Sequence, residues 1–257
     1  MDNESPQTPL LSIRNLSKSF GPIKAVNNVS LDIMVGEVVG LVGDNAAGKS
    51  TFLSLLTGYH RKDTGEFIYR GKPVSVSSPR ESRNRLKIEM VYQNLSLAPD
   101  LPVWQNMFLG EERRRFGVFN DRKAMVSDAD KVLQELNAKA RATDIVGTLS
   151  GGEQQLVAIG RALLFERDLI IMDEPTAAIS VAKIEDVLRL IVQLKSRGKS
   201  VILVSHRLED VLTVADRIVV FSHGTVKSIL PNRHLNISDL IQVMFDRKKE
   251  ATDNAEN

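Results

Sequence analysis

Residues Gly43–Ser50 read GDNAAGKS, and they stand between an apolar run, Glu37–Val42, and a run with helical character, Thr51–Leu56. A strand, a glycine-rich loop and a helix in this order form a phosphate-binding P-loop. Glycines let the loop turn its backbone N–H groups toward an anion, and the helix N-terminus adds partial positive charge. The pattern therefore predicts a triphosphate site at this loop.

Two residues of the loop have separate expected roles. Lys49 is predicted to reach the β- and γ-phosphates, and the Ser50 hydroxyl to ligate Mg²⁺. The alternative is a glycine-rich turn whose lysine merely faces solvent. The residues expected to contact a nucleotide here are Gly43, Asp44, Asn45, Ala46, Ala47, Gly48, Lys49, Ser50 and Thr51.

A second motif, Asp168–Glu174, is a short apolar run that ends in two carboxylates. This pattern is typical of a buried parallel strand that delivers acids at its C-terminal end. Asp173 is expected to hold Mg²⁺ through its water shell, and Glu174 to polarise the water that attacks the γ-phosphate. A core strand followed by an acidic turn is the alternative.

The third motif is Leu149–Gln155, LSGGEQQ. Ser150 and Glu153 have the spacing of a capping box, which predicts a well-started helix. Gly151 and Gly152 at the first helical positions lower helix propensity, but they leave bare N–H groups that an anion can approach.

With these three motifs the chain resembles the nucleotide-binding subunit of an ABC transporter, from about Leu10 to the 230s. Gly43–Ser50 matches the Walker A motif of that family, Leu149–Gln155 its signature and Leu169–Glu174 its Walker B motif. The resemblance implies ATP and Mg²⁺ as cofactors and ATP hydrolysis as the activity, with Lys49, Glu174 and His206 as catalytic residues.

Further family segments follow in the same order. Phe20 stands where an aromatic ring stacks on adenine, and Gln93 stands at the Q-loop, where the resemblance implies contact with the nucleotide and Mg²⁺. Ala177–Ser180 occupies the D-loop, and His206 is the switch histidine.

The resemblance also implies partners. The signature of one subunit caps the nucleotide held by Walker A of another, so the chain is expected to work as a homodimer or paired with a homologous ATPase. Ser150 and the amides of Gly151 and Gly152 would contact the γ-phosphate of the partner's nucleotide. Transmembrane permease subunits, and through them a periplasmic or extracellular substrate-binding protein, complete the expected assembly.

Two positions depart from the usual family pattern. Ala46 replaces a glycine in Walker A and is expected to add strain of about 1 kcal/mol if this position needs a positive φ. Ser180 replaces an aspartate that many relatives carry in the D-loop, which removes a carboxylate from the expected dimer interface.

The segments Gln93–Gly110, Glu174–Ala182 and Ser205–Arg207 resemble monosaccharide importers of the ribose, xylose and fructose type. The expected function is therefore the ATP-hydrolysing subunit of a monosaccharide importer. An importer of another solute, a soluble ABC ATPase, a small-molecule kinase and a non-catalytic regulatory copy remain as alternatives.

Composition agrees with this interpretation. The chain has 257 residues, 42% of them hydrophobic and 26% charged, and it has no cysteine, so no disulfide forms. No apolar run approaches the ~20 residues that cross a bilayer, and Met1–Pro6 is acidic and polar, unlike a signal peptide. We expect a cytoplasmic location on the inner face of the cell membrane. The net charge of +2 is too small to argue for nucleic-acid binding, and no nucleic-acid partner is expected.

The expected fold is α/β: a P-loop NTPase (RecA-like) core with an antiparallel β subdomain and an inserted α-helical subdomain. One ATPase domain is expected over residues 10–232, with its core at 10–93 and 166–232 and its helical subdomain at 94–165. A C-terminal helix at 233–246 and flexible tails at 1–9 and 247–257 complete the layout. The expected early strands are Leu10–Arg14, Val29–Met34, Val38–Val42, Phe67–Tyr69 and Ile88–Gln93. The later core elements are Leu169–Met172, Val181–Ser196, Ser200–Val204, Leu208–Ala215, Arg217–Phe221, Thr225–Leu230 and Ile237–Phe245.

Overall fold

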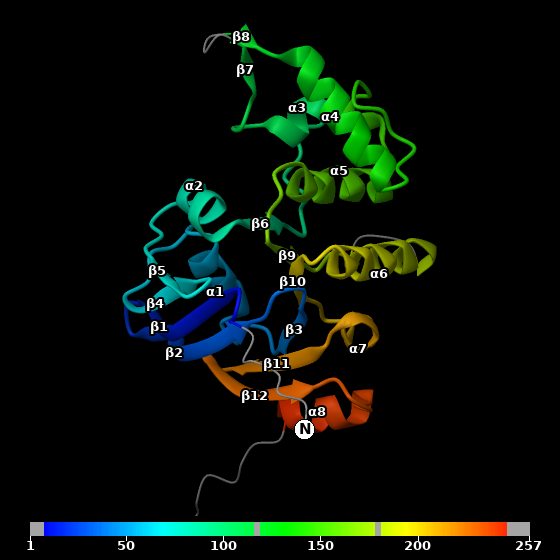
Figure 1. The fold of residues 1–257 in the computed structure, drawn as a ribbon. Coiled ribbons are helices and arrows are strands. Elements are labelled where there is room, and N and C mark those ends of the chain that lie inside the picture. Colours follow the sequence, from blue (N-terminus) through cyan, green and yellow to red (C-terminus); the bar gives the residue numbers. More distant parts are fainter. Residues whose placement is uncertain (1–7, 116–118, 178–180, 246–257) are drawn as a thin grey trace, which may run out of the picture.

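The computed structural model describes residues 8–115, 119–177 and 181–245 (Figure 1). Its centre is a six-stranded sheet with the order β12-β11-β3-β10-β9-β6. All neighbouring strands pair in parallel except β11 and β12, which form an antiparallel hairpin. The strands are β3 (Val38–Gly43), β6 (Ile88–Val91), β9 (Leu169–Asp173), β10 (Ser200–Val204), β11 (Arg217–Ser222) and β12 (Thr225–Pro231).

A second, antiparallel sheet has the order β2-β1-β4-β5. Its strands are β1 (Leu11–Phe20), β2 (Ile23–Ile33), β4 (Thr64–Tyr69) and β5 (Lys72–Val74). The hairpin of β1 and β2 is longer than the runs Leu10–Arg14 and Val29–Met34 predicted. Asn15 has a φ of 50°, and the β1–β2 register shifts between Ile13 and Leu16. This irregularity breaks the period-2 pattern from which strand length is predicted.

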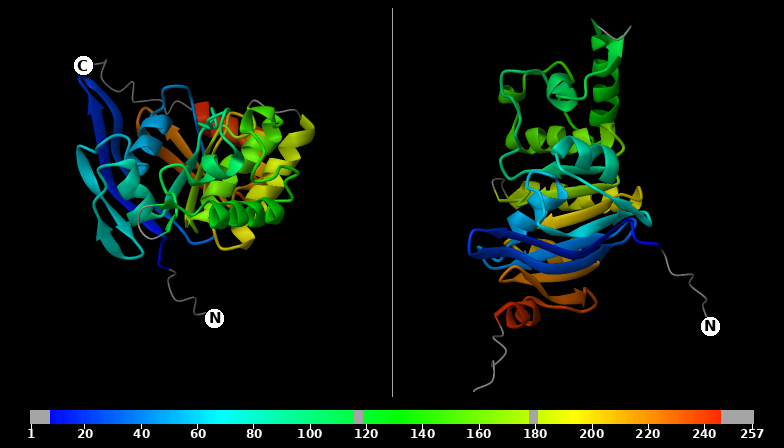
Figure 2. Two further views of the ribbon diagram at one scale, coloured as in Figure 1. Left: turned by 90° about the horizontal axis from the view of Figure 1, so that it is seen from above. Right: turned by 90° about the vertical axis from the view of Figure 1, so that its left-hand side faces the viewer.

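Residues 94–165 contribute most of an upper lobe of helices, which Figure 2 shows standing above the sheets. The lobe contains α3 (Val103–Phe108), α4 (Arg122–Glu135), the 3₁₀ turn η2 (Val146–Thr148) and α5 (Gly151–Leu164). It also contains a short hairpin, β7 (Arg114–Arg115) with β8 (Phe119–Asn120), where only helices were expected. The remaining helical elements are α1 (Lys49–Leu56), α2 (Pro79–Glu81), the π-helix η1 (Ser82–Leu86), α6 (Val181–Ser196), α7 (Leu208–Val214) and α8 (Ile237–Phe245).

The six-stranded sheet separates two hydrophobic cores, because alternate residues of each strand point to opposite faces. Val39 and Leu41 of β3 face one core, with α1 and the antiparallel sheet. Val38 and Val42 face the other, with α6, α7 and the helical lobe. Both faces of the central strands are therefore buried, as expected for a parallel sheet.

Most predicted ranges agree with the structure. α6, β10 and α8 begin and end at the predicted residues, and β11 and β12 are each one residue longer than predicted. The strand expected at Ile88–Gln93 ends at Val91 instead, so Gln93 lies on the loop that follows β6. α2, η1 and β5 were not predicted. Ser78 caps α2 by accepting a hydrogen bond from the Glu81 N–H, with Pro79 in the first helical turn, and this local signal is readable in the sequence.

Candidate functional site

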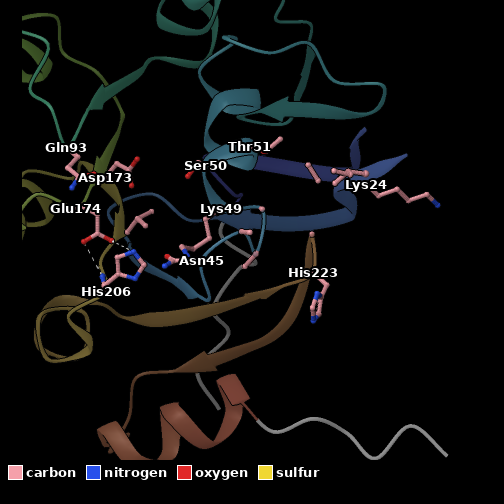
Figure 3. A pocket seen from close by; sticks show the side chains of 17 residues that line it. Lys24, Asn45, Lys49, Ser50, Thr51, Gln93, Asp173, Glu174, His206 and His223 are labelled. Carbon is pink, nitrogen blue, oxygen red and sulfur yellow. Dashed lines mark hydrogen bonds and ion pairs between the residues drawn. The ribbon is translucent and has the colours of Figure 1, made fainter. Parts of the chain in front are cut away.

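A cleft of about 550 Å³ opens at the C-terminal ends of β3, β9 and β10, beside the N-terminus of α1 (Figure 3). Ligands of open parallel sheets bind at this edge. The cleft is lined by Ile23, Lys24, Ala25, Asn45, Ala46, Ala47, Gly48, Lys49, Ser50, Thr51, Gln93, Asp173, Glu174, Val204, His206, His223 and Gly224.

The two glycines of the P-loop motif are required by the backbone. Gly43 has a φ of 152°, and a Cβ there would lie 2.2 Å from the carbonyl oxygen of Phe221. Gly48 has a φ of 101° and caps α1; a Cβ there would lie 2.3 Å from the carbonyl oxygen of Ala25. Larger residues at these two positions would push the loop away from β11 and β2.

Ala46 lies in the left-handed region, with a φ of 64°. The strain expected for a positive φ at this position therefore applies, and Ala46 carries backbone strain of about 1 kcal/mol. The residue is exposed and lines the cleft.

The Lys49 ammonium is enclosed beneath the loop. Its Nζ donates hydrogen bonds to the carbonyl oxygens of Gly43 at 2.6 Å and Asp44 at 2.9 Å, and the residue is 9% exposed. Burial lowers the pKa of Lys49, and the nearby carboxylates of Glu174 and Asp173 oppose that shift. A phosphate group bound at the loop would add a further negative charge beside this buried ammonium.

The two carboxylates at the end of β9 are also desolvated. Burial raises the pKa of Asp173 and of Glu174, while Lys49 and His206 oppose both shifts. Glu174 has a φ of 50°, and its N–H donates to the carbonyl of Val204 at 2.9 Å, which ties the end of β9 to the end of β10.

His206 follows β10 and contacts Glu174 twice, as Figure 3 shows. Its backbone N–H donates to Glu174 Oε2 at 3.2 Å, and its Nε2 lies 3.4 Å from Oε1. Apart from this ion-pair contact, Oε1 is buried and accepts no hydrogen bond from the described residues. One oxygen of this raised-pKa carboxylate is thus left without a hydrogen-bond donor among the described residues.

The cleft brings together most of the site residues predicted at the P-loop, at Gln93, at Walker B and at His206. Gly43 and Asp44 do not line the cleft; their carbonyl oxygens accept the hydrogen bonds of Lys49. Phe20 does not line the cleft either; it is 43% exposed and contacts His60 and Lys18. Residues 178–180 of the expected D-loop, including Ser180, lie outside the described residues.

The signature segment lies elsewhere. Ser150 caps α5 in the predicted capping box with Glu153, and both line a different cleft of about 710 Å³ with Gly152. Gly151 lines a smaller cavity of about 240 Å³ that also reaches Gln93 and Glu174. A Cβ on Gly151 would meet no atom of the described residues within 4 Å, so none of these residues requires glycine there.

Several lining residues were not predicted, among them Ile23, Lys24 and His223. Gly224, in the turn between β11 and β12, donates its N–H to the carbonyl of Ala47 at 2.8 Å and accepts from the Asn27 N–H at 2.8 Å. The last hairpin of the sheet therefore supports the P-loop. The sequence indicates a turn at His223–Gly224 but not its contact with Ala47.

Comparisons with known proteins identify relatives along nearly the whole chain. The family model described as "ABC transporter" matches residues 26–177. The xylose/arabinose import ATP-binding protein XylG of Sulfolobus acidocaldarius is 42% identical over 91% of this chain and 93% of its own length. The ribose import ATP-binding protein RbsA of Yersinia pestis is 38% identical over 94% of this chain. The chain spans about half of that relative, 47% of its length.

Solved structures have the same fold. The ADP conformation of MJ1267, an ATP-binding cassette of an ABC transporter, has a TM-score of 0.79 and 27% identity over 93% of this chain and 96% of its own. The dimeric post-hydrolysis state of the ATP-binding cassette MJ0796, bound to ADP and Pi, has a TM-score of 0.74 and 27% identity, covering 88% of this chain and all of its own.

Within the described residues, none of the helices combines the length and hydrophobicity that a bilayer crossing needs. The fold is a P-loop NTPase core with an antiparallel β sheet and a lobe of helices, as the sequence predicted. Given the match over residues 26–177 and the 42% identity to XylG, the chain belongs to the ABC transporter family of ATP-binding proteins.

Proposed function

We propose that this chain binds and hydrolyses ATP to power an ABC importer for a monosaccharide. The observation that carries the proposal is the shared cleft of Lys49, Asp173, Glu174 and His206, in which a buried ammonium faces two desolvated carboxylates. This arrangement suits a triphosphate and its attacking water. The names of relatives over most of the chain, import ATP-binding proteins, support the coupling to import.

We propose that the triphosphate lies along the P-loop. The N–H groups at the start of α1 and the Lys49 ammonium would bind the β- and γ-phosphates, and Asn45–Thr51 would surround them. The hydrogen bonds from Lys49 to Gly43 and Asp44 would then be exchanged for bonds to phosphate oxygens. This exchange satisfies the buried ammonium better, because phosphate carries a full negative charge.

The donor set in the cleft fits Mg²⁺. A hydroxyl from Ser50, an amide oxygen from Gln93 and the desolvated carboxylate of Asp173 line one cleft, and oxygen donors of this kind are the ligands Mg²⁺ prefers. The described residues contain no group of three or more His, Cys, Asp and Glu that could form a protein-only metal site. The three oxygen donors of the cleft agree with an ion shared between protein and phosphate oxygens, which would neutralise phosphate charge.

Glu174 is proposed as the general base. Its raised pKa, and an Oε1 that accepts no hydrogen bond from the described residues, suit proton abstraction from a water near the γ-phosphate. His206, whose backbone N–H fixes the other carboxylate oxygen, is proposed to contact the γ-phosphate through its ring. The positive φ of Glu174 supports such a role, because strained backbone is concentrated at functional sites.

We further propose a head-to-tail dimer in the cytoplasm, on the inner face of the membrane, bound to permease subunits that receive their solute from a substrate-binding protein. Ser150, Gly151 and Gly152 would contact the γ-phosphate of the partner's nucleotide. The open space around Gly151 supports this, since glycine there leaves room for something outside the chain. A solved relative is described as a dimeric cassette. The division into a 10–232 ATPase domain and a 94–165 helical subdomain is part of this proposal.

The test uses Glu174→Gln, an isosteric change that removes the base. We expect ATP binding to persist and steady-state phosphate release to fall at least about tenfold, with an ATP-loaded dimer accumulating on size-exclusion chromatography. Lys49→Ala is the comparison variant and should lose ATP affinity in a fluorescent-nucleotide titration. Hydrolysis by Glu174→Gln at the unmodified rate would reject the assigned base.

Co-purification with a permease, followed by sugar binding to the matching binding protein, tests the import step.

A further inference from the structure

Three aromatic side chains line up just beyond the C-terminus of α1. The rings of Phe20 and His60 are 5.2 Å apart at 70°, and those of His60 and Tyr59 are 5.2 Å apart at 74°. Both contacts are edge-to-face, the favoured geometry for aromatic pairs. His60 is partly buried between its neighbours, whereas Tyr59 is 71% exposed.

Phe20 is also held from the β1 side. The Lys18 ammonium lies 5.5 Å from the centroid of the Phe20 ring, within cation–π range. Asp63 fixes this lysine at 2.7 Å and accepts the backbone N–H of Ser19 at 2.7 Å. The Phe20 ring is therefore held by two partners, yet the residue keeps 43% of its surface exposed.

The segment that carries His60 is attached to α1. The His60 N–H donates to the carbonyl of Ser54 at 3.1 Å, and the Asp63 N–H donates to Ser17 in β1 at 2.9 Å. α1 has 8 residues and thus a length of about 12 Å. The N-terminus of α1 carries Lys49 and Ser50. The segment after its C-terminus carries His60, whose ring contacts Phe20.

The contacts that hold the Phe20 ring matter for nucleotide binding because of where Phe20 lies relative to the cleft. Ile23, the cross-strand neighbour of Phe20, lines the cleft and is 67% exposed, whereas Phe20 lies just outside the lining. A base extending from the cleft past Ile23 would meet the Phe20 ring. Its stacking would depend on the orientation of that ring, which His60 and Lys18 hold.

We propose that His60 is a positioning residue for the nucleobase: it holds the Phe20 ring at the angle on which adenine stacks, without touching the phosphates. This inference rests on the proposed ATP-binding function. It assigns two tasks to α1 and the segment after it, because the helix presents the phosphate cradle at its N-terminus and the segment beyond its C-terminus holds the base platform.

The experiment compares two ligands on the full chain: Mg·ATP, and inorganic tripolyphosphate, which has no base. Each is measured by displacement of a ribose-labelled fluorescent ATP. We expect His60→Ala to weaken ATP binding by about threefold to tenfold, the range that one aromatic contact carries. Tripolyphosphate affinity should change by less than about twofold, and kcat should stay within about twofold while KM for ATP rises.

Four further variants control for structural damage. His60→Leu keeps the volume but removes the aromatic edge, so it should behave like His60→Ala, whereas His60→Phe should restore ATP affinity. Tyr59→Ala removes the outer ring, which touches His60 but makes no contact with Phe20 among the described rings, and should bind both ligands normally. On a Phe20→Ala background, His60→Ala should cause no further loss, because the two residues act together.

Equal weakening of ATP and tripolyphosphate would show that His60 only stabilises α1, and it would overturn the inference. Unchanged ATP affinity in both His60→Ala and His60→Leu would overturn it as well. An unmodified chain that binds tripolyphosphate but shows no preference for ATP would reject the base platform while leaving the phosphate cradle intact. An unmodified chain that binds neither ligand would reject the proposed function, and this inference with it.

Discussion

Ala46 keeps a side chain at a point of the P-loop where the backbone is left-handed. The strain is tolerated because Ala47 N–H donates to Asp44 at 3.1 Å and Gly224 donates to Ala47 at 2.8 Å, which fix the turn on both sides. The loop therefore holds a conformation that the isolated segment would rarely adopt.

Substitutions at Ala46 should reveal this strain. Ala46→Gly removes the steric conflict, so we expect ATP affinity equal to or tighter than that of the unmodified chain. Ala46→Val places a β-branched residue at a φ of 64°, and ATP affinity should fall at least about tenfold. A fluorescent-nucleotide titration measures both. Equal affinity for the Gly and Val variants would mean that the loop relaxes freely at this position.

The sequence predicts site residues best where one motif holds them. Lys49 and Ser50 lie at the cleft because the loop and helix geometry is local. Glu174 and His206 meet because β9 and β10 pair in parallel, with Asp173 opposite Val204. Ile23, Lys24 and His223 could not be predicted, since their approach depends on how the antiparallel sheet and the last hairpin pack against the loop. No local pattern records that packing.

At the scale of elements, a charged cluster joins β6 to the helical lobe. Glu89 of β6 is 6% exposed and lies 3.3 Å from Arg161 of α5 and 3.3 Å from Arg167, which precedes β9. Arg167 also contacts Glu111 after α3, at 2.5 Å, and Arg161 donates to the Leu109 carbonyl at 2.9 Å. The cluster holds the lobe next to the strand that leads to Gln93.

Glu89→Gln should be strongly destabilising. The change removes one of two carboxylates: Arg161 loses its Glu89 partner, and the buried Arg167 keeps Glu111 alone. Breaking a buried pair in this way typically costs about 3 kcal/mol or more. For a chain of this size the Tm should fall by roughly 6–12 °C in calorimetry. The matched control is Arg189→Gln, which breaks the exposed pair with Asp186 and should change stability by less than about 1 kcal/mol. Equal shifts in both variants would contradict the importance of burial.

A second junction joins the two sheets. Asp168, just before β9, accepts hydrogen bonds from the Tyr69 hydroxyl of β4 and from Arg70 at 3.1 Å. Burial alone would raise the pKa of Asp168, but these two hydrogen bonds, together with the positive charges of Arg70 and Lys199, outweigh it and hold the pKa below the ordinary value of 3.8. The charged form is therefore more favourable in the folded chain than in the unfolded chain.

The pH dependence of stability follows from the lowered pKa of Asp168. The contribution of Asp168 to stability is present above the unfolded pKa and is lost as pH falls through the lower folded pKa. Asp168→Asn should thus lower the Tm at pH 7, and the difference from the unmodified chain should shrink as pH falls below about 4. Calorimetry at several pH values measures it. Tyr69→Phe keeps the Arg70 contact and should give a smaller difference; a difference independent of pH would refute the assignment.

The boundaries of helices and strands differ in how well the sequence predicts them. α6, β10 and α8 were predicted to the residue because their hydrophobic periods are uninterrupted and polar residues or glycine flank them. The outer part of β1–β2 and the β7–β8 hairpin were missed. In the first, Asn15 interrupts the alternation; in the second, each strand is two residues long and carries no period at all.

At the scale of the whole molecule, Ser150 and Lys49 line different clefts of one chain. Gly151 lines a further cavity that also reaches Gln93 and Glu174. In the proposed dimer the signature acts on a nucleotide held by the other protomer. A mixing experiment can check this arrangement.

Two defective chains should restore activity to each other. Lys49→Ala loses its own nucleotide cradle, and Ser150→Arg blocks the α5 N-terminus, so each alone should be inactive. A mixed dimer contains one intact composite site, and equimolar mixing should recover roughly a quarter of the unmodified ATPase rate for random pairing and independent sites. Mixing that yields no more phosphate release than either variant alone would place the signature and Walker A in the same chain's site.

The contact between Gly224 and Ala47 has a practical consequence for deletion mapping. Truncations that remove the 217–231 hairpin would also take away the hydrogen bond that steadies the phosphate loop. Such shortened chains would lose nucleotide although every ligating side chain was still present, and the defect would be misread as a C-terminal binding region.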